Sequence, residues 1–182
     1  MGKSTLINNM RALHDVVIIH EPTHLHTVEP LHDQSAIDAW YFVAHADNLE
    51  NVCASAQRER RNIFIERSVL SSVAFTNAYD RHAAKQHDLQ KHINKFLNTL
   101  DHIRSVTGTC ARIIYLTPRD LPAIIGYVRG HSYLNKFGDE GSICTYEKYL
   151  RELIQNIEAD GRAKILLNPT LEMLTDDINS RV

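Results

Sequence analysis

Two apolar runs of this chain end in side chains that can do acid–base and phosphate chemistry. Glu21 follows the run Val16–His20, and Arg67 follows the run Asn62–Glu66, whose last residue is itself acidic. A carboxylate such as Glu21 can take a proton from a hydroxyl, a guanidinium can hold a phosphate by its planar fork, and Glu66 can bind Mg²⁺ or its waters. The alternatives are a solvated loop acid at Glu21 and a local ion pair or helix-start charge at Glu66 and Arg67.

The first residues of the chain match the end of a phosphate-binding turn. Gly2, Lys3 and Ser4, followed by Thr5, supply the last part of the pattern G-x-x-x-x-G-K-[ST]. In that pattern the lysine reaches the β/γ-phosphate oxygens of a nucleotide, and the hydroxyl binds Mg²⁺. The glycine-rich first half does not precede Gly2, so the tetrapeptide alone is a weak signal. The alternative is an ordinary helix start.

Strands and helices alternate along the chain and position these side chains. Four apolar runs predict strands at Val16–His20, Asn62–Glu66, Arg112–Leu116 and Lys164–Leu167. The runs are nearly continuous, as is typical of parallel strands covered on both faces. Helical spacing predicts helices over 89–103, 121–128 and 146–157. It also predicts a long helix that runs to about Arg60 from an N-cap at Ser35, with Asp38 three residues on. This order predicts one α/β domain, 1–182, with a parallel sheet flanked by helices and ligands beyond the carboxyl ends of its strands.

A phosphate-binding turn normally joins the first strand of such a sheet to the first helix. In the chain as given the helix begins directly after Gly2, so we expect this central strand to be missing. Its absence would leave two half-sheets whose inner edges carry unpaired N–H and C=O groups, which are costly to bury. We therefore expect Met1 to be an internal methionine or the start of a truncated chain.

The composition excludes several classes of protein. The chain has 182 residues and a net charge of −2, so no bulk electrostatic binding to nucleic acid polymers or to membranes is expected. No apolar run is long enough to span a bilayer. The three cysteines are odd in number and widely spaced, which favours a reducing compartment, and we expect a cytoplasmic protein. Histidines 20, 24, 26 and 32 form the one dense group, for which a zinc site is a minor alternative.

Taken together, these motifs resemble those of the deoxynucleoside kinase family. The resemblance covers almost the whole chain: Gly2–Thr5, then Glu21-Pro22, then Glu66-Arg67-Ser68, then a helix, a strand and an arginine-bearing segment. It implies a P-loop nucleoside/nucleotide kinase fold and phosphorylation of a nucleoside 5′-hydroxyl with ATP and Mg²⁺. Glu21 would be the general base, and Arg67 would contact the reacting oxygen and phosphate. Gly2–Thr5 would bind the nucleotide, with Ser4 and Glu66 on the metal.

The same resemblance places the nucleoside-binding residues. Alignment through Trp40 and Phe42 puts His45 where the family has a base-reading glutamine, and a histidine can still hydrogen-bond a base edge. Ser72 replaces the aspartate that the family has shortly after E-R-S. Phe75, on the helix that follows, could stack on the base. Both departures leave the preferred base open.

The segment of about 127–145 resembles a kinase lid. Arg129 matches the first lid arginine, which would stabilise charge on the transferring phosphate. His131 replaces the second lid arginine. Glu140 falls where these kinases keep a glutamate on the sugar 3′-hydroxyl, although the segment is longer than the family pattern. The alternative is a polar surface loop.

Three other functions stay open. Ser71–Phe75 resembles the S-S-x-A-Y segment of thymidylate kinases, but Phe42-Val43-Ala44 is followed by His45 where those enzymes have an arginine for the acceptor phosphate. A monophosphate acceptor needs a positive partner, which favours a nucleoside. A non-catalytic P-loop remnant is the second rival, and a GTPase is the third, although the chain has no N-K-x-D motif. The expected partner is a small nucleoside, and a homodimer is left open.

Overall fold

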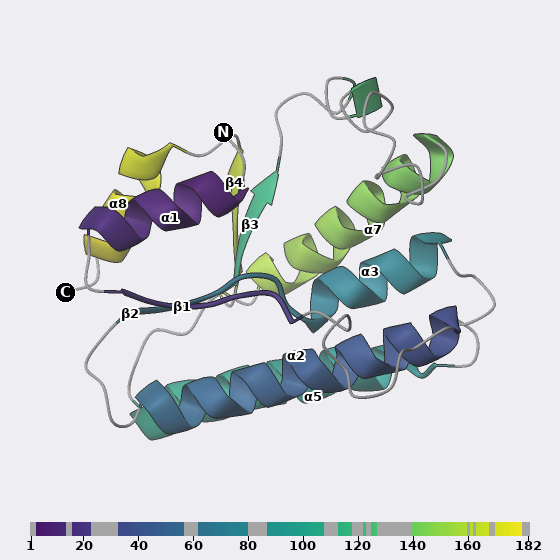
Figure 1. The fold of residues 1–182 in the computed structure, drawn as a ribbon, viewed down its shortest axis with the longest axis horizontal. Coiled ribbons are helices and arrows are strands. Elements are labelled where there is room, and N and C mark those ends of the chain that lie inside the picture. The colour runs from purple at the N-terminus through teal and green to yellow at the C-terminus, as the bar shows by residue number, and fades with distance from the viewer. Residues whose placement is uncertain are drawn as a thin grey trace.

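The computed structural model describes most of the chain. The described residues are 3–13, 16–22, 33–56, 62–79, 87–107, 113–117, 122, 125–126, 140–159, 161, 163–167 and 170–179. In chain order the elements are α1 (Lys3–Leu13), β1 (Val16–Ile19), α2 (Gln34–Ala56), β2 (Asn62–Ile65), α3 (Val69–Tyr79), α5 (Leu89–Thr107), β3 (Ile113–Thr117), α7 (Glu140–Ala159), β4 (Ala163–Leu167) and α8 (Leu171–Asn179), as Figure 1 shows. Helices predominate, and the strands alternate with them, so the fold belongs to the α/β class.

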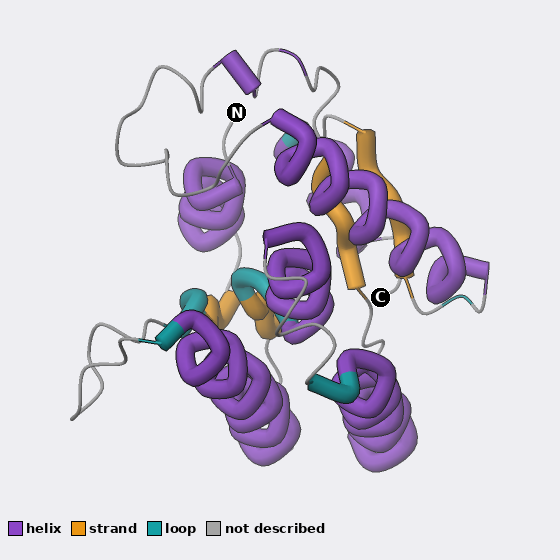
Figure 2. Tube along the Cα trace, turned by 90° about the vertical axis from the view of Figure 1, so that its right-hand side faces the viewer, coloured by secondary structure: helices purple, strands orange, loops and turns teal. Residues whose placement is uncertain are grey.

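The four predicted strands are confirmed, each to within about one residue at either end. β1 pairs with β2 in parallel, with Val16 opposite Asn62. β3 pairs with β4 in parallel, with Ile113 opposite Ala163. Within the described residues these are two separate two-stranded sheets, and Figure 2 shows the two orange pairs apart from each other.

Helices cover both faces of the strands. Phe64 of β2 and Ile114 of β3 pack against a small core made by Leu6 and Met10 of α1 and Leu174 of α8. The neighbouring strand residues Ile65, Ile113 and Tyr115 pack against the larger core on the other side. Successive residues of a strand point to opposite faces, so the strands lie in the middle of three layers. This explains why the strands are apolar at almost every position.

The larger core lies among α2, α3, α5 and α7. α3 is its centre, because Val73, Ala74 and Thr76 have no exposed surface and Leu70 has almost none. A helix that is apolar nearly all round is a buried one. The segment that directly precedes α3 contains Arg67, so this rigid helix positions the predicted site.

The start of α2 differs from the prediction. Asp33, not Ser35, caps the helix: its Oδ2 accepts a hydrogen bond of 2.9 Å from the Ala36 amide. Ser35 is the second residue of α2, and its hydroxyl is 3.2 Å from His87 Nε2. Asp38, predicted to support the cap, is instead buried and accepts a 2.7 Å hydrogen bond from the Thr76 hydroxyl of α3. The Asp33 cap is favoured because its short carboxylate reaches the amide three residues on.

Among the helices that the structure describes, none combines the length and the apolar character needed to cross a membrane.

Candidate functional site

The carboxyl ends of β1 and β2 bring Glu21 and Arg67 into contact. The Glu66 amide donates a 2.8 Å hydrogen bond to the Ile19 carbonyl, so the two strands stay paired up to their ends. Just beyond, Arg67 Nε lies 3.0 Å from Glu21 Oε2, and their side chains are 43% and 32% exposed. An ion pair this open to water contributes little stability. The pair matters chemically because a carboxylate and a guanidinium lie together where a ligand can reach both.

Arg67 has an unusual backbone. Its φ is +74°, and it is the one non-glycine residue with positive φ in the described part of the chain. This left-handed conformation costs an arginine about 1 kcal/mol, because its Cβ crowds the following carbonyl. Strain of this kind clusters at functional sites, where the surrounding structure holds it. The Arg67 side chain is 43% exposed, so its guanidinium is accessible from solvent.

Glu66, the residue before Arg67, is buried. Its Oε2 is 3.1 Å from Nδ1 of His20, whose side chain is largely exposed. A buried carboxylate at the end of a strand fits Mg²⁺ or its water ligands chemically. The described residues contain no group of three or more His, Cys, Asp or Glu side chains that could hold a metal ion. A metal there would therefore need oxygen from a ligand, from water or from hydroxyls.

Tyr146 of α7 is a further polar group whose pKa responds to both members of the Glu21–Arg67 pair, whereas the helical spacing over 146–157 predicted only a helix there. Its hydroxyl hydrogen-bonds the Ser71 side chain in the first turn of α3. Burial raises the pKa of the Tyr146 phenol, while Arg67 and the Ser71 hydrogen bond act in the opposite direction and Glu21 adds to the rise. The phenol is therefore neutral at physiological pH, and it lies within electrostatic reach of both members of the ion pair.

His45 lies on the buried face of α2. Asp38, Phe42, His45 and Leu49 are all buried, at helical spacing. Burial, with a smaller contribution from the Arg67 charge, lowers the pKa of His45 to about 4. Among the described residues, its buried Nδ1 has no hydrogen-bond partner, and a buried nitrogen left in this way costs about 1–3 kcal/mol. Because the His45 side chain is buried, a ligand could reach its ring only if the residues that cover it moved.

We predict that His45 makes the fold acid-sensitive. An unfolded histidine takes up a proton below about pH 6.5, whereas His45 stays neutral down to about pH 4. Protonation therefore favours the unfolded chain between these values, and the free energy of unfolding falls as the pH falls. At about 1.4 kcal/mol per pH unit the loss is about 3 kcal/mol, with no effect above pH 7. Urea unfolding at half-unit pH steps measures it.

Two variants isolate this contribution from other titrating groups. His45→Gln should remove the steep part of the curve between pH 6.5 and 4. His102→Gln, which changes an exposed histidine of α5, should leave the curve as in the wild type. Parallel pH curves for the wild type and His45→Gln would contradict a buried neutral His45.

The other predicted nucleoside-binding residues are spread over two helices. Ser72 and Phe75 are half-buried on α3, and the Phe75 ring stacks on Tyr79 with centroids 4.5 Å apart. Glu140 is the first residue of α7 and is exposed. Their predicted roles in nucleoside binding stay predictions.

Several predicted site residues lie outside what the structure describes. Gly2, Arg129 and His131 are outside the described residues, as are the side chains of Lys3 and Ser4. Three histidines of the dense group, 24, 26 and 32, are outside as well. Thr5 is exposed on α1. α1 runs back along β1, so its first turn faces the same end of the fold as the carboxyl ends of β1 and β2 (Figure 1).

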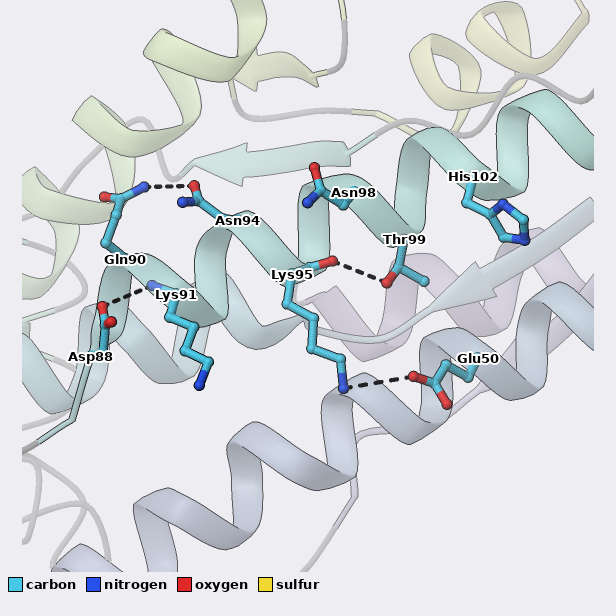
Figure 3. Close-up of a pocket in the computed structure, with 9 residues that line it drawn as sticks. All are labelled: Glu50, Asp88, Gln90, Lys91, Asn94, Lys95, Asn98, Thr99 and His102. Carbon is cyan, nitrogen blue, oxygen red and sulfur yellow. Dashed lines mark hydrogen bonds and ion pairs between the residues drawn. The ribbon is translucent and has the colours of Figure 1, made fainter.

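A shallow groove of about 750 Å³ lies elsewhere, over α5 and α2 (Figure 3). The residues that line it have polar or charged side chains and include Lys95 and Glu50, whose paired Nζ and Oε1 atoms are 3.7 Å apart. Figure 3 shows its side chains mostly along the outer surface of α5. None of the predicted site residues lines it, so the groove and the Glu21–Arg67 cluster are separate features.

The candidate site therefore consists of the Glu21 carboxylate, the strained Arg67 and the neutral Tyr146 phenol, near the carboxyl ends of β1 and β2. Such a set can bind an anionic group beside a hydroxyl and accept a proton from that hydroxyl. No family model matches this chain, and no curated protein or solved structure is significantly similar to it.

Proposed function

We propose that this protein is a P-loop-type kinase that transfers the γ-phosphoryl group of ATP to the 5′-hydroxyl of a deoxynucleoside. The observation that supports it best is the contact between Glu21 and Arg67 at the carboxyl ends of β1 and β2. Ligands of open α/β sheets bind at that edge. Parallel strands with helices on both faces are compatible with this kinase fold.

Glu21 acts as the general base. About a third of its side chain is exposed, so a nucleoside hydroxyl can approach it. Phosphoryl transfer needs little covalent help from a protein, because positioning and electrostatics supply most of the rate. Glu21 therefore orients the attacking hydroxyl and accepts its proton as the new bond to phosphorus forms.

Arg67 binds the transferring phosphoryl group. Its Nε is engaged by Glu21, while the end-on pair of N–H groups on its two terminal nitrogens can bind two phosphate oxygens. The fork neutralises charge that shifts onto these oxygens in the transition state. The left-handed backbone at Arg67 fits a residue that is held in place for function at some cost in stability.

The nucleotide is held at the start of α1. The helix N-terminus favours anionic groups, and Lys3 would add a positive charge and Ser4 a hydroxyl. Bound Mg²⁺ would polarise the phosphate oxygens, with Ser4 and Glu66 as the residues that hold it. His45 and Ser72 would set the base preference, with Phe75 against the base, Arg129 on the phosphates and Glu140 on the sugar 3′-hydroxyl.

An ATP-consumption assay against the four deoxynucleosides and thymidine monophosphate tests this function. Turnover on a nucleoside, abolished without Mg²⁺, is the expected result and identifies the base selected. Turnover on the monophosphate alone would assign the protein to nucleoside-monophosphate kinases instead. A folded sample that consumes no ATP with any acceptor would overturn the kinase proposal and favour a non-catalytic nucleotide-binding protein.

A further inference from the structure

A hydrogen bond between side chains of α2 and α3 lies inside the larger core. The Thr76 hydroxyl donates it to Asp38 Oδ2 over 2.7 Å. Asp38 is 3% exposed, and Thr76 has no exposed surface. A buried carboxylate is costly unless it is hydrogen-bonded. The proposed mechanism uses neither of these residues.

This hydrogen bond fixes how α2 sits along α3. The side chains around it, which include Phe42 of α2 and Val73 and Ala74 of α3, are apolar members of one core. Apolar burial is non-directional, whereas a hydrogen bond requires a particular distance and direction. A shift of α2 along α3 would break the bond between Thr76 and Asp38 within the core. The pair therefore holds the two helices in one register.

The same two helices carry the residues that are predicted to select the base. His45 follows Asp38 by seven residues on the buried face of α2, and Ser72 precedes Thr76 by four residues on α3. Residues at these spacings share a face of their helix. α2 and α3 pack against each other and run in opposite directions (Figure 1). From the hydrogen bond, His45 on α2 and Ser72 on α3 therefore lie in the same direction.

We propose that Asp38 and Thr76 are positioning residues for base selection, because their hydrogen bond sets the register in which His45 and Ser72 meet the nucleobase. This inference rests on the proposed function, in which those two side chains set the base preference. Asp38 and Thr76 are buried, so they act through their helices and not by contact with the ligand. Discrimination between similar ligands depends on how closely the site matches each of them, so a changed register weakens the preference.

Three substitutions and a double variant isolate the hydrogen bond. Thr76→Val replaces the hydroxyl with a methyl group of similar size, and Thr76→Ser is the conservative variant that keeps the hydroxyl. Thr99→Val is the matched control, because the Thr99 hydroxyl bonds the Lys95 carbonyl of its own helix in an exposed position. Asp38→Asn/Thr76→Val removes the buried charge together with the hydrogen bond, and it replaces Thr76→Val if that variant does not fold.

The experiment measures nucleoside binding and turnover separately. Calorimetry gives the Kd of each variant for the four deoxynucleosides, and steady-state kinetics give kcat. We expect Thr76→Val and the double variant to lower the ratio of the weakest to the tightest Kd about 10-fold. Thr76→Ser and Thr99→Val should keep the wild-type ratio. kcat on the preferred nucleoside should stay within about twofold, because the substitution affects binding of the base and not the transition state.

The outcomes separate this inference from the kinase function. An unchanged Kd ratio in Thr76→Val, or the same loss in Thr76→Ser or Thr99→Val, would overturn the positioning role and leave the kinase function standing. A wild-type enzyme that binds all four nucleosides equally would do the same. A lowered ratio in a protein that binds nucleosides without turnover would support the positioning role and remove the kinase function. A folded protein that binds no nucleoside would remove both.

Discussion

Replacing Glu21 with glutamine is expected to lower kcat by about 10²–10⁴-fold and to leave nucleoside binding largely intact. General base catalysis contributes a factor of this size, and an interaction needed only in the transition state affects kcat rather than ground-state affinity. Glutamine keeps a carbonyl oxygen that can accept from Arg67 Nε, now 3.0 Å from Glu21 Oε2, so the geometry survives. Steady-state kinetics with calorimetric nucleoside binding measure both quantities.

Glu50→Gln is the matched control for this change. Glu50 also pairs with a cation, Lys95, at 3.7 Å on the exposed surface of α2 and α5. The substitution removes one negative charge from the chain, as Glu21→Gln does, but far from the predicted chemistry. It should leave kcat within about twofold of the wild type. An unchanged kcat in Glu21→Gln would remove Glu21 from the mechanism.

The strands could be predicted because their signal is local. Val16–Ile19 and Ile113–Thr117 are nearly continuous β-branched and aliphatic runs, and such runs need cover on both faces. The structure supplies that cover, with α1 and α8 on one side and the larger core on the other. The proximity of Glu21 and Arg67 could be predicted from these strands, because the carboxyl ends of paired parallel strands lie together.

The features that were missed depend on contacts between distant parts of the chain. Tyr146 fits an apolar stripe equally well whether its hydroxyl is free or bonded, and only the packing of α7 on α3 brings it to Ser71. The predicted cap of α2 was wrong: Ser35 and Asp38 match a capping pattern, but Asp33 caps the helix two residues earlier by accepting from the Ala36 amide, and tertiary contacts engage the side chains of Ser35 and Asp38. No local rule decides between equivalent polar groups two residues apart.

The left-handed backbone of Arg67 leads to a second prediction with a large expected effect. One substitution at this residue should change activity and stability separately. Arg67→Gly removes the guanidinium, so kcat should fall about 10³-fold, as when a charge-stabilising arginine is lost from a phosphoryl-transfer site. Yet glycine adopts φ near +74° without strain, and the exposed ion pair that is lost contributes little. We therefore expect the free energy of unfolding of Arg67→Gly to stay within about 1 kcal/mol of the wild type.

Arg67→Ala and Gly161→Ala complete this test. Arg67→Ala loses the same guanidinium but keeps a Cβ, so it should be about 1 kcal/mol less stable than Arg67→Gly. Gly161 has φ +70° and nothing within 4 Å of an added Cβ, so Gly161→Ala measures the cost of the left-handed backbone alone, without loss of activity. Urea unfolding gives these differences. If Arg67→Gly proved less stable than Arg67→Ala, the backbone at this residue would not be strained, and the argument that strain is kept there for function would fail.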